Sequence, residues 1–242
     1  MKKHIGIIGG GAAGMMAAIT AAQKGAKVTI LERNDRIGKK ILQTGNGKCN
    51  LGNRNLTVEC YHGGDAAWIK QALERFGTED TVCFFQKIGL LIKEKNGYLY
   101  PVSEQAASVL DVLRYELQTL GVEIIYGCKV QKVERTLSGE IVVNDGDREW
   151  QFDAVILTCG GKAAPGTGSD GSGWKIAKKA GHTCIAPVPA LVQLRCLETD
   201  LLKGIAGVRA DSRVRILCDG RETDVERGEL QLTEYGISGI PI

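Results

Sequence analysis

Short apolar and glycine-rich blocks at the start of the chain predict a strand, a turn, a helix and a second strand. Residues 5–8 (IGII) are typical of a strand buried on both faces of a sheet. A glycine-rich turn follows at 9–14, and the alanine-rich residues 15–24 favour a helix that ends at Gly25. A second strand is predicted over 27–32. The blocks together have about the 30 residues expected of a β-α-β unit.

Helical spacing of apolar residues continues in the middle of the chain. An amphipathic helix is predicted over 66–76, and Thr78 is a candidate N-cap of a second helix. Ser103 is a candidate N-cap of a third helix over 104–120. The apolar residues on one face of the first helix are Trp68, Ile69, Leu73 and Phe76.

Alternating and short apolar runs predict further strands. Asn96-Gly97, between two apolar runs, predicts a β-hairpin. Residues 129–134, 140–143 and 150–152 predict an antiparallel meander, and 153–159 predict a strand that returns to the main sheet. From 187 onward the predicted strands are 190–196, 213–218 and 229–233, with polar turns between them. We therefore predict two domains, residues 1–186 and a β-rich domain at 187–242.

Composition and charge argue against several classes of protein. The chain has 242 residues, 31 basic and 28 acidic side chains and a net charge of +3, which argues against a nucleic-acid-binding protein. No run approaches the length of about 18 apolar residues that spans a membrane, and the N-terminus has no signal-peptide core. The eight cysteines have no zinc-site spacing, so we expect no metal and mostly buried, reduced thiols in a cytoplasmic protein.

The glycine-rich turn has the chemistry of a dinucleotide site. Gly9 permits a tight turn, Gly11 lets the backbone approach a pyrophosphate, and Gly14 lets the helix pack on the strand. Glu32 ends the second strand, where a carboxylate suits the hydroxyls of an adenosine ribose and repels a 2′-phosphate. The alternative is a glycine-rich turn of an α/β domain that binds no phosphate.

Two further glycine-rich segments suggest an extended cofactor such as FAD. Residues 34–50 interrupt the regular β-α alternation of a plain NAD-binding domain, and Lys39, Lys40 and Lys48 would neutralise phosphate charge. A solvated basic loop is the alternative for this segment. A second segment, 166–173, follows the strand that ends at Gly160-Gly161, and its alternative is a flexible linker.

Three motifs follow the glycine-rich turn at 9–14 in this order: TGNGKCN at 44–50, TCGGK at 158–162 and TGSDG at 167–171. Together they resemble the two-dinucleotide-binding flavoproteins, specifically the HI0933-like (BaiN/YhiN-type) FAD-dependent oxidoreductases. The resemblance implies an α/β fold: a Rossmann-like FAD-binding domain with the start of a β-rich second domain. Members of this family are longer, so we expect that 187–242 form an incomplete substrate domain.

The resemblance also implies a set of FAD contacts. It places Glu32 on the adenosine ribose, the turn on the pyrophosphate, Arg33 and Lys40 near the adenosine and phosphates, and 47–50 near the isoalloxazine. Val130 would contact adenine through its backbone, and 159–161 would line the adenosine half. The predicted cofactor-binding residues are Gly9, Gly10, Gly11, Ala12, Ala13, Gly14, Glu32, Arg33, Lys40, Gly45, Asn46, Gly47, Lys48, Cys49, Asn50, Val130, Cys159, Gly160 and Gly161.

These patterns predict a flavin-dependent oxidoreductase that transfers hydride between FAD and a small organic substrate of the enone or amine/ketone class, with NAD(P)H as a possible electron donor. Two alternatives stay open: a non-catalytic dinucleotide-binding module or inactive truncated fragment, and a flavoprotein that modifies tRNA, against which the balanced charge argues. The sequence indicates no catalytic residue and no oligomeric state. His4, His62 and His182 are more typical of structural positions, and Cys49 of a small packing residue.

Overall fold

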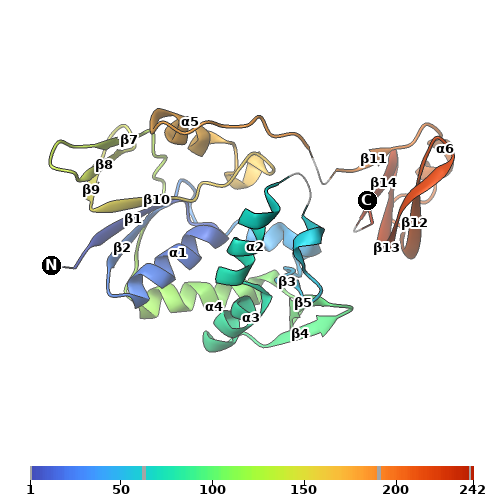
Figure 1. Cartoon of the computed structure of the whole chain (residues 1–242), viewed down its shortest axis with the longest axis horizontal. Helices are drawn as coiled ribbons and strands as arrows, with labels where there is room; N and C mark the ends of the chain where they lie inside the picture. The colour runs from blue at the N-terminus through green and yellow to red at the C-terminus, as the bar shows by residue number, and fades with distance from the viewer. Residues whose placement is uncertain (1, 62–63, 190–191, 240) are drawn as a thin grey trace. The chain divides into compact units, whose positions relative to one another are not determined.

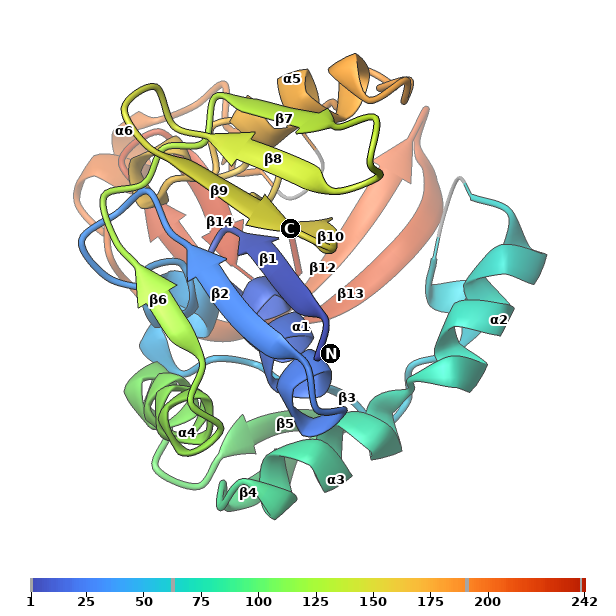
Figure 2. The ribbon, with the colours of Figure 1, turned by 90° about the vertical axis from the view of Figure 1, so that its left-hand side faces the viewer.

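A parallel four-stranded sheet organises the first part of the chain in the computed structural model, which describes all residues except 1, 62–63, 190–191 and 240. The strand order is β10-β1-β2-β6; Figure 1 labels the first three of these strands, and Figure 2 labels all four. The strands are β1 (His4–Ile8), β2 (Lys27–Leu31), β6 (Glu123–Ile125) and β10 (Ala154–Leu157). Ile8 of β1 pairs with Leu31 on one side and with Leu157 on the other. The carboxyl ends of these three strands therefore meet at one edge of the sheet.

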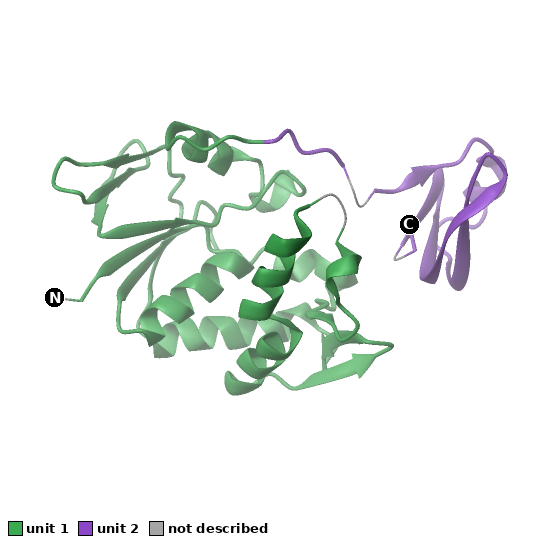
Figure 3. Cartoon of the chain, viewed as in Figure 1, with its two compact units in different colours: residues 1–184 green, residues 185–242 purple. Residues whose placement is uncertain are grey.

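The chain divides into two compact units, Met1–Cys184 and Ile185–Ile242 (Figure 3). The boundary predicted from the sequence falls between 186 and 187. The parallel sheet belongs to the first unit.

Two helices cover one face of the parallel sheet, as Figure 2 shows. They are α1 (Ala12–Gln23), which connects β1 to β2, and α4 (Ala106–Thr119), which precedes β6. Every second residue of a strand points to the same face, and Ile7, Val28 and Ile30 accordingly pack against these helices. The predicted β-α-β unit is confirmed by the order and parallel pairing of β1, α1 and β2.

A small antiparallel sheet covers the opposite face. It consists of β7 (Lys132–Arg135), β8 (Ile141–Asn144) and β9 (Glu149–Phe152), the predicted meander. Phe152 is buried against Ile8 and Leu31 of the main sheet. A Cβ atom at Gly6 would lie 2.6 Å from the Phe152 ring, so this strand position has to be glycine for the two sheets to pack.

The segment between β2 and α4 builds a helical and hairpin layer. The predicted hairpin is confirmed: β4 (Ile92–Lys95) and β5 (Tyr98–Pro101) pair across Asn96 and Gly97, which both have positive φ, as the tight turn requires. The other elements of the layer are η1 (Ile41–Gly47), β3 (Gly52–Asn53), η2 (Val58–Cys60), α2 (Ala66–Arg75) and α3 (Thr78–Lys87).

Both N-caps predicted in this layer are wrong. The N-cap of α3 is Gly77, and the Thr78 hydroxyl donates to the carbonyl of Asn53. The N-cap of α4 is Gln105, while the Ser103 hydroxyl accepts from the Gln105 N–H before the helix begins. The apolar face predicted for α2 carries no buried residue, and Trp68 is 68% exposed.

After β10 the first unit ends with η3 (Pro165–Thr167) and α5 (Ser172–Lys179). The second unit contains an antiparallel sheet in the order β11-β14-β13-β12 and a short helix, α6 (Asp200–Lys203). Residues 190–191 of the strand predicted over 190–196 lie outside the described residues, and β11 covers Leu194–Arg195. The remaining strands are β12 (Arg209–Cys218), β13 (Arg221–Thr233) and β14 (Gly236–Gly239).

A chain of hydrogen bonds that begins at His4 links β1, β2 and β6 at the end of the sheet opposite the glycine-rich turn. His4 Nε2 lies 2.9 Å from the Thr29 hydroxyl, which donates to the Glu123 carboxylate. Burial and the charge of Lys27 lower the pKa of His4, while Glu123 and Asp153 oppose that shift. The fold therefore favours neutral His4.

We expect this histidine to make folding less stable in mild acid. Since the pKa of His4 is lower in the folded state than in the unfolded chain, the unfolded chain binds the proton first as pH falls through the ordinary histidine range. The urea midpoint should drop between pH 7.5 and 5.5, and it should drop less in His4→Gln. An equal drop in both proteins would contradict this role for His4.

Candidate cofactor-binding site

A pocket of about 350 Å³ opens where β1, β2 and β10 end and α1 begins. All of its lining residues belong to the first unit. Binding sites of open α/β sheets lie at this edge, outside the carboxyl ends of the strands. Ile8, Leu31 and Ile176 contribute apolar wall, while Glu32, Lys40 and the glycine-rich turn contribute polar groups.

Close backbone contacts shape the turn at the base of the pocket. Gly9 has a φ of +105°, and a Cβ atom there would lie 2.8 Å from the carbonyl oxygen of Thr158. A Cβ atom at Gly14 would overlap the carbonyl oxygen of Gly9. The Thr158 hydroxyl donates to the carbonyl oxygens of Ile8 and Gly9, which fastens the turn to the end of β10. Gly14 is thus required for packing and lies beneath the pocket.

Glu32 has a buried carboxylate held by three N–H groups. One oxygen accepts from the Gly10 N–H at 2.7 Å, and the other accepts from the backbone and side-chain nitrogens of Asn34 at 2.8 and 2.7 Å. The residue is only 6% exposed, yet it lines the pocket. A carboxylate oxygen has more than one acceptor position, so Glu32 can still accept hydrogen bonds from the hydroxyls of a ribose.

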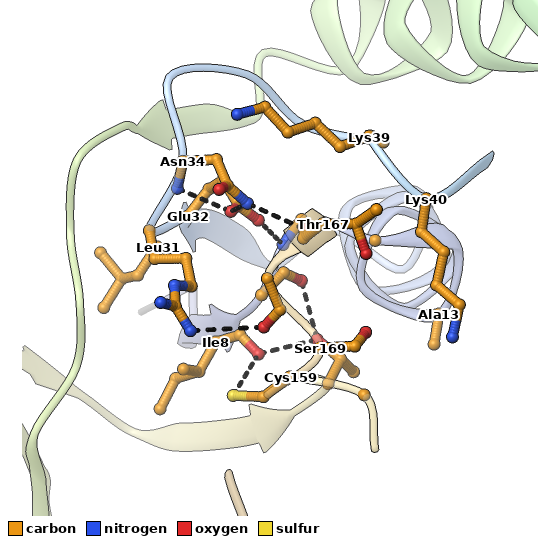
Figure 4. Close-up of a pocket in the computed structure, with 18 of the residues that line it drawn as sticks. Ile8, Ala13, Leu31, Glu32, Asn34, Lys39, Lys40, Cys159, Thr167 and Ser169 are labelled. Carbon is orange, nitrogen blue, oxygen red and sulfur yellow. Dashed lines mark hydrogen bonds between the residues drawn. The ribbon is translucent and has the colours of Figure 1, made fainter. Parts of the chain in front are cut away.

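The N-terminus of α1 is suited to a phosphate group. The first N–H groups of a helix have no intrahelical acceptor, and no side chain caps this end. A Cβ atom at Gly11 would meet nothing within 4 Å, so the turn leaves open space there. Figure 4 shows Lys40 extending beside Ala13, whereas Lys39 extends toward the side of Asn34. Helix dipole and ammonium charge therefore both favour an anion at this end.

Two pocket-lining cysteines remain protonated at neutral pH. Burial, and then the nearby Asp145, raise the pKa of Cys128 to about 12. Burial, and then the carboxylates of Glu32 and Asp170, raise the pKa of Cys159 to about 11. A thiolate is the nucleophilic form of cysteine, so neither side chain is prepared for covalent chemistry.

The structure brings together more than half of the predicted cofactor-binding residues. The pocket is lined by Gly9, Gly10, Gly11, Ala12, Ala13, Glu32, Arg33, Lys40, Val130, Cys159 and Gly160. The predicted residues that do not line it are Gly14, Gly45, Asn46, Gly47, Lys48, Cys49, Asn50 and Gly161. Their contact with a cofactor stays a prediction.

The segment 44–50 has a strained backbone. Gly45, Asn46, Gly47 and Cys49 all have positive φ, which is uncommon for the two non-glycine residues. Lys48 pairs with Glu104 at 3.3 Å, and Cys49 is buried in the core beneath α4. The interpretation of Cys49 as a packing residue agrees with this position. Such strain concentrates at functional sites, but of this segment only Thr44 lines the pocket.

Sequence reasoning missed part of the pocket wall. The loop after β10 supplies several lining residues, including Thr167, Gly168 and Ser169 of the TGSDG motif, which the sequence does not assign to the site. Asn34 lies two positions after Glu32, and the sequence does not single it out because an amide there belongs to no known motif. Lys39, which the sequence predicts to neutralise phosphate charge, also lines the pocket. The missed residues are Ile8, Leu31, Asn34, Arg36, Gly38, Ile41, Thr44, Cys128, Lys129, Thr158, Thr167, Gly168, Ser169, Ser172 and Ile176.

Other chemistry-bearing residues lie elsewhere. His4 lies at the opposite end of the sheet, His182 follows α5 without entering a strand, and His62 lies outside the described residues. The prediction that most cysteines are buried is wrong, because only Cys49 and Cys128 are. Within the described part of the chain, no group of three or more His, Cys, Asp or Glu side chains is arranged to hold a metal ion. No helix of that part has the length and apolar character to cross a membrane.

The parallel sheet, the glycine-rich turn and the acidic residue at the end of β2 define a Rossmann-type α/β domain with a dinucleotide pocket. Residues 3–236 match the family model of the HI0933-like protein Rossmann domain. The chain belongs to this family, and the predicted α/β fold class and family are both confirmed.

The chain is similar to two curated relatives whose names give different activities. The chain is 48% identical over 241 residues to the 3-dehydro-bile acid delta(4,6)-reductase of Clostridium scindens, covering 99% of this chain and 58% of the relative. It is 32% identical over 238 residues to the ribosomal RNA dihydrouridine synthase of Haemophilus influenzae, covering 96% of this chain and 58% of that protein. The chain thus spans less than two thirds of the length of either relative.

A solved structure supports the fold alone. The open conformation of a flavocytochrome c3 fumarate reductase matches with a TM-score of 0.55 and 18% identity, covering 87% of this chain and 47% of the other.

Proposed function

We propose that residues 1–184 bind FAD and that the protein is a flavin-dependent oxidoreductase that transfers hydride between FAD and a small organic substrate. The observation that carries the proposal is the pocket in which the Glu32 carboxylate and the uncapped N-terminus of α1 face the same space. An adenosine ribose and a pyrophosphate are linked in FAD and need these two groups. Membership of the HI0933-like family supports the same cofactor.

The residues of the pocket would bind and orient the cofactor. Glu32 would accept hydrogen bonds from the ribose, and the first turn of α1 with Lys40 would offset the pyrophosphate charge. Ile8, Leu31 and Val130 would exclude water from the adenosine half. When bound, FAD supplies the hydride-transfer chemistry itself. The contacts of 45–50 with the cofactor, among which 47–50 would lie near the flavin ring, belong to this proposal. So does the separation into domains 1–186 and 187–242.

The substrate class rests on a relative. The 48% identity to a 3-dehydro-bile acid reductase supports an enone of similar size as substrate. NAD(P)H as electron donor, a cytoplasmic location and the lack of a nucleic-acid partner complete the proposal. The ribosomal RNA dihydrouridine synthase is the less similar relative, and the near-neutral charge of this chain gives RNA little attraction. A non-catalytic module is less favoured, because a named reductase covers 99% of the chain.

FAD retention tests the core of the proposal. The purified chain, mixed with excess FAD and passed through a desalting column, is expected to keep about one FAD per chain, as measured by its visible absorption. FMN, which lacks the adenosine half, should be lost on the same column because it cannot engage Glu32. Loss of both flavins, or equal retention of both, would contradict this assignment of the pocket.

A second measurement addresses the substrate. The FAD-loaded protein, reduced without oxygen, is expected to be reoxidised by a steroid 4-en-3-one and not by ribosomal RNA. Reoxidation by RNA alone would contradict the enone substrate and would favour an RNA substrate, as the name of the ribosomal RNA dihydrouridine synthase suggests.

A further inference from the structure

A compact loop forms one wall of the pocket. Residues 160–171, here called the 160–171 loop, leave the end of β10 and return to the start of α5. The Gly171 N–H donates to the carbonyl of Gly161 at 2.9 Å, which closes the loop at its base. A bridge between Ala164 and Ser169 closes it again near its tip, and Thr167 and Ser169 are buried. The loop is therefore an ordered structure of the Ω type rather than the flexible linker left open by the sequence.

Side chains at the end of β2 fasten this loop across the pocket. Arg33 Nη1 donates to the Asp170 carboxylate at 2.6 Å and to the Gly168 carbonyl at 3.4 Å. Asn34 Nδ2 donates to the Thr167 carbonyl at 3.2 Å. All of these residues except Asp170 line the pocket. The chain next to the ribose-facing Glu32 thus holds a loop that lies more than 130 positions further along the sequence.

The charges show why the ion pair matters to an anionic ligand. Arg33, and then the hydrogen bond from Ser172, hold the pKa of Asp170 far below the ordinary carboxyl range. Burial raises the pKa of Cys159 in the pocket wall most, and the charges of Glu32 and then Asp170 raise it further, so both carboxylates act on the pocket. Arg33 offsets the second of them. Without Arg33, a pyrophosphate would face the charge of Asp170 uncompensated.

We propose that Asp170 is a positioning residue: through Arg33 it keeps the 160–171 loop closed on the adenosine half of the pocket and so sets how fast the dinucleotide dissociates. This inference rests on the proposed FAD site and adds to it a residue outside the pocket wall. Both side chains are 31% exposed. Their interaction is therefore partly screened by water, and the loop can open often enough to release the cofactor.

The variant Asp170→Asn separates this role from a local one. Asp170 Oδ1 also accepts at 3.0 Å from the N–H of Ser172, the first residue of α5, and an asparagine keeps that acceptor while losing the charge. FAD dissociation, followed by the recovery of flavin fluorescence on dilution, is expected to be about 3- to 5-fold faster. Arg33→Met should be about 10-fold faster, because it also exposes the Asp170 charge.

Three further proteins control the interpretation. Arg33→Met combined with Asp170→Asn should dissociate more slowly than Arg33→Met alone, since the uncompensated charge is gone. Arg33→Lys should recover part of the slow dissociation. Glu79→Gln, which breaks the Arg54–Glu79 ion pair of the same unit outside the pocket, should leave the rate unchanged. A rate in Asp170→Asn equal to that of the unaltered chain would overturn the proposal.

Hydrogen exchange of the FAD-free protein tests the loop independently of the cofactor. Amides of the 160–171 loop are expected to exchange faster in Asp170→Asn and Arg33→Met, while those of α4 stay unchanged. If the unaltered chain fails to retain FAD but this difference appears, the proposed function fails and the fastening of the loop stands. Unchanged exchange in the loop would overturn the fastening itself.

Discussion

Alanine at position 14 is expected to destabilise the protein by about 3 kcal/mol or more and to abolish FAD retention. The added methyl group would overlap the carbonyl oxygen of Gly9 and approach the Thr158 hydroxyl to 2.9 Å. Neither group can move easily, because that hydroxyl donates to the Gly9 carbonyl and ties the turn to β10. Relief of the overlap would require α1 to shift away from β1. The measurement is the urea midpoint of Gly14→Ala in the absence of FAD.

Two matched variants control for a general cost of replacing glycine. Gly166→Ala places its methyl group in open space in the 160–171 loop and should leave stability and FAD affinity unchanged within about 0.5 kcal/mol. Gly11→Ala also meets nothing within 4 Å, so it should keep its stability but bind FAD less tightly, because the methyl group would stand where a phosphate approaches. If Gly14→Ala is as stable as Gly166→Ala, the helix does not approach the Gly9 carbonyl as closely as described.

Glutamine at position 32 is expected to weaken FAD binding by a factor on the order of 100 or more, since two hydrogen bonds to a charged acceptor are lost. The N–H groups of Gly10 and Asn34 that donate to Glu32 also require that both oxygens of the side chain be acceptors. An amide offers one oxygen, so either Gly10 or Asn34 would face another donor. Equilibrium titration with FAD measures the loss, and the urea midpoint should fall as well.

Glu74→Gln, an exposed change on α2, is the control for removing one negative charge. Its FAD affinity should equal that of the unaltered chain. Glu32→Asp keeps the charge on a shorter side chain and should bind FAD with intermediate affinity. An unaltered dissociation constant in Glu32→Gln would exclude the ribose contact.

Local sequence chemistry predicts the β-α-β unit well because its requirements are local. Gly9 and Gly14 are required because a Cβ atom at either position would clash within the turn or with the end of the neighbouring strand. Their spacing is visible in the sequence. The N-cap predicted at Thr78 is wrong for the opposite reason. The Thr78 hydroxyl donates to the carbonyl of Asn53, on a strand 25 positions earlier. The residues next to Thr78 in the sequence do not indicate that its hydroxyl binds the Asn53 carbonyl.

The wall of the pocket shows the same limit at longer range. The resemblance places Arg33 near the adenosine and phosphates, but its partner Asp170 is 137 positions away. The resemblance drew attention to the TGSDG motif without saying which side chain it would meet. The unburied apolar face of α2 is a related case, since helical spacing shows that a face is apolar and not what covers it.

The pairing of β1 with β10 affects how the protein folds while it is being synthesised on the ribosome. β1 is synthesised first, but Ile8 of β1 pairs with Leu157 of β10, which is synthesised much later. At about 5–20 residues per second, roughly 7 to 30 s pass between the synthesis of these two strands. During that time β1, α1 and β2 can assemble, while the outer edge of β1 remains open to another chain. Aggregation during expression is therefore expected to depend on elongation speed and on chaperones that shield the nascent N-terminal strand.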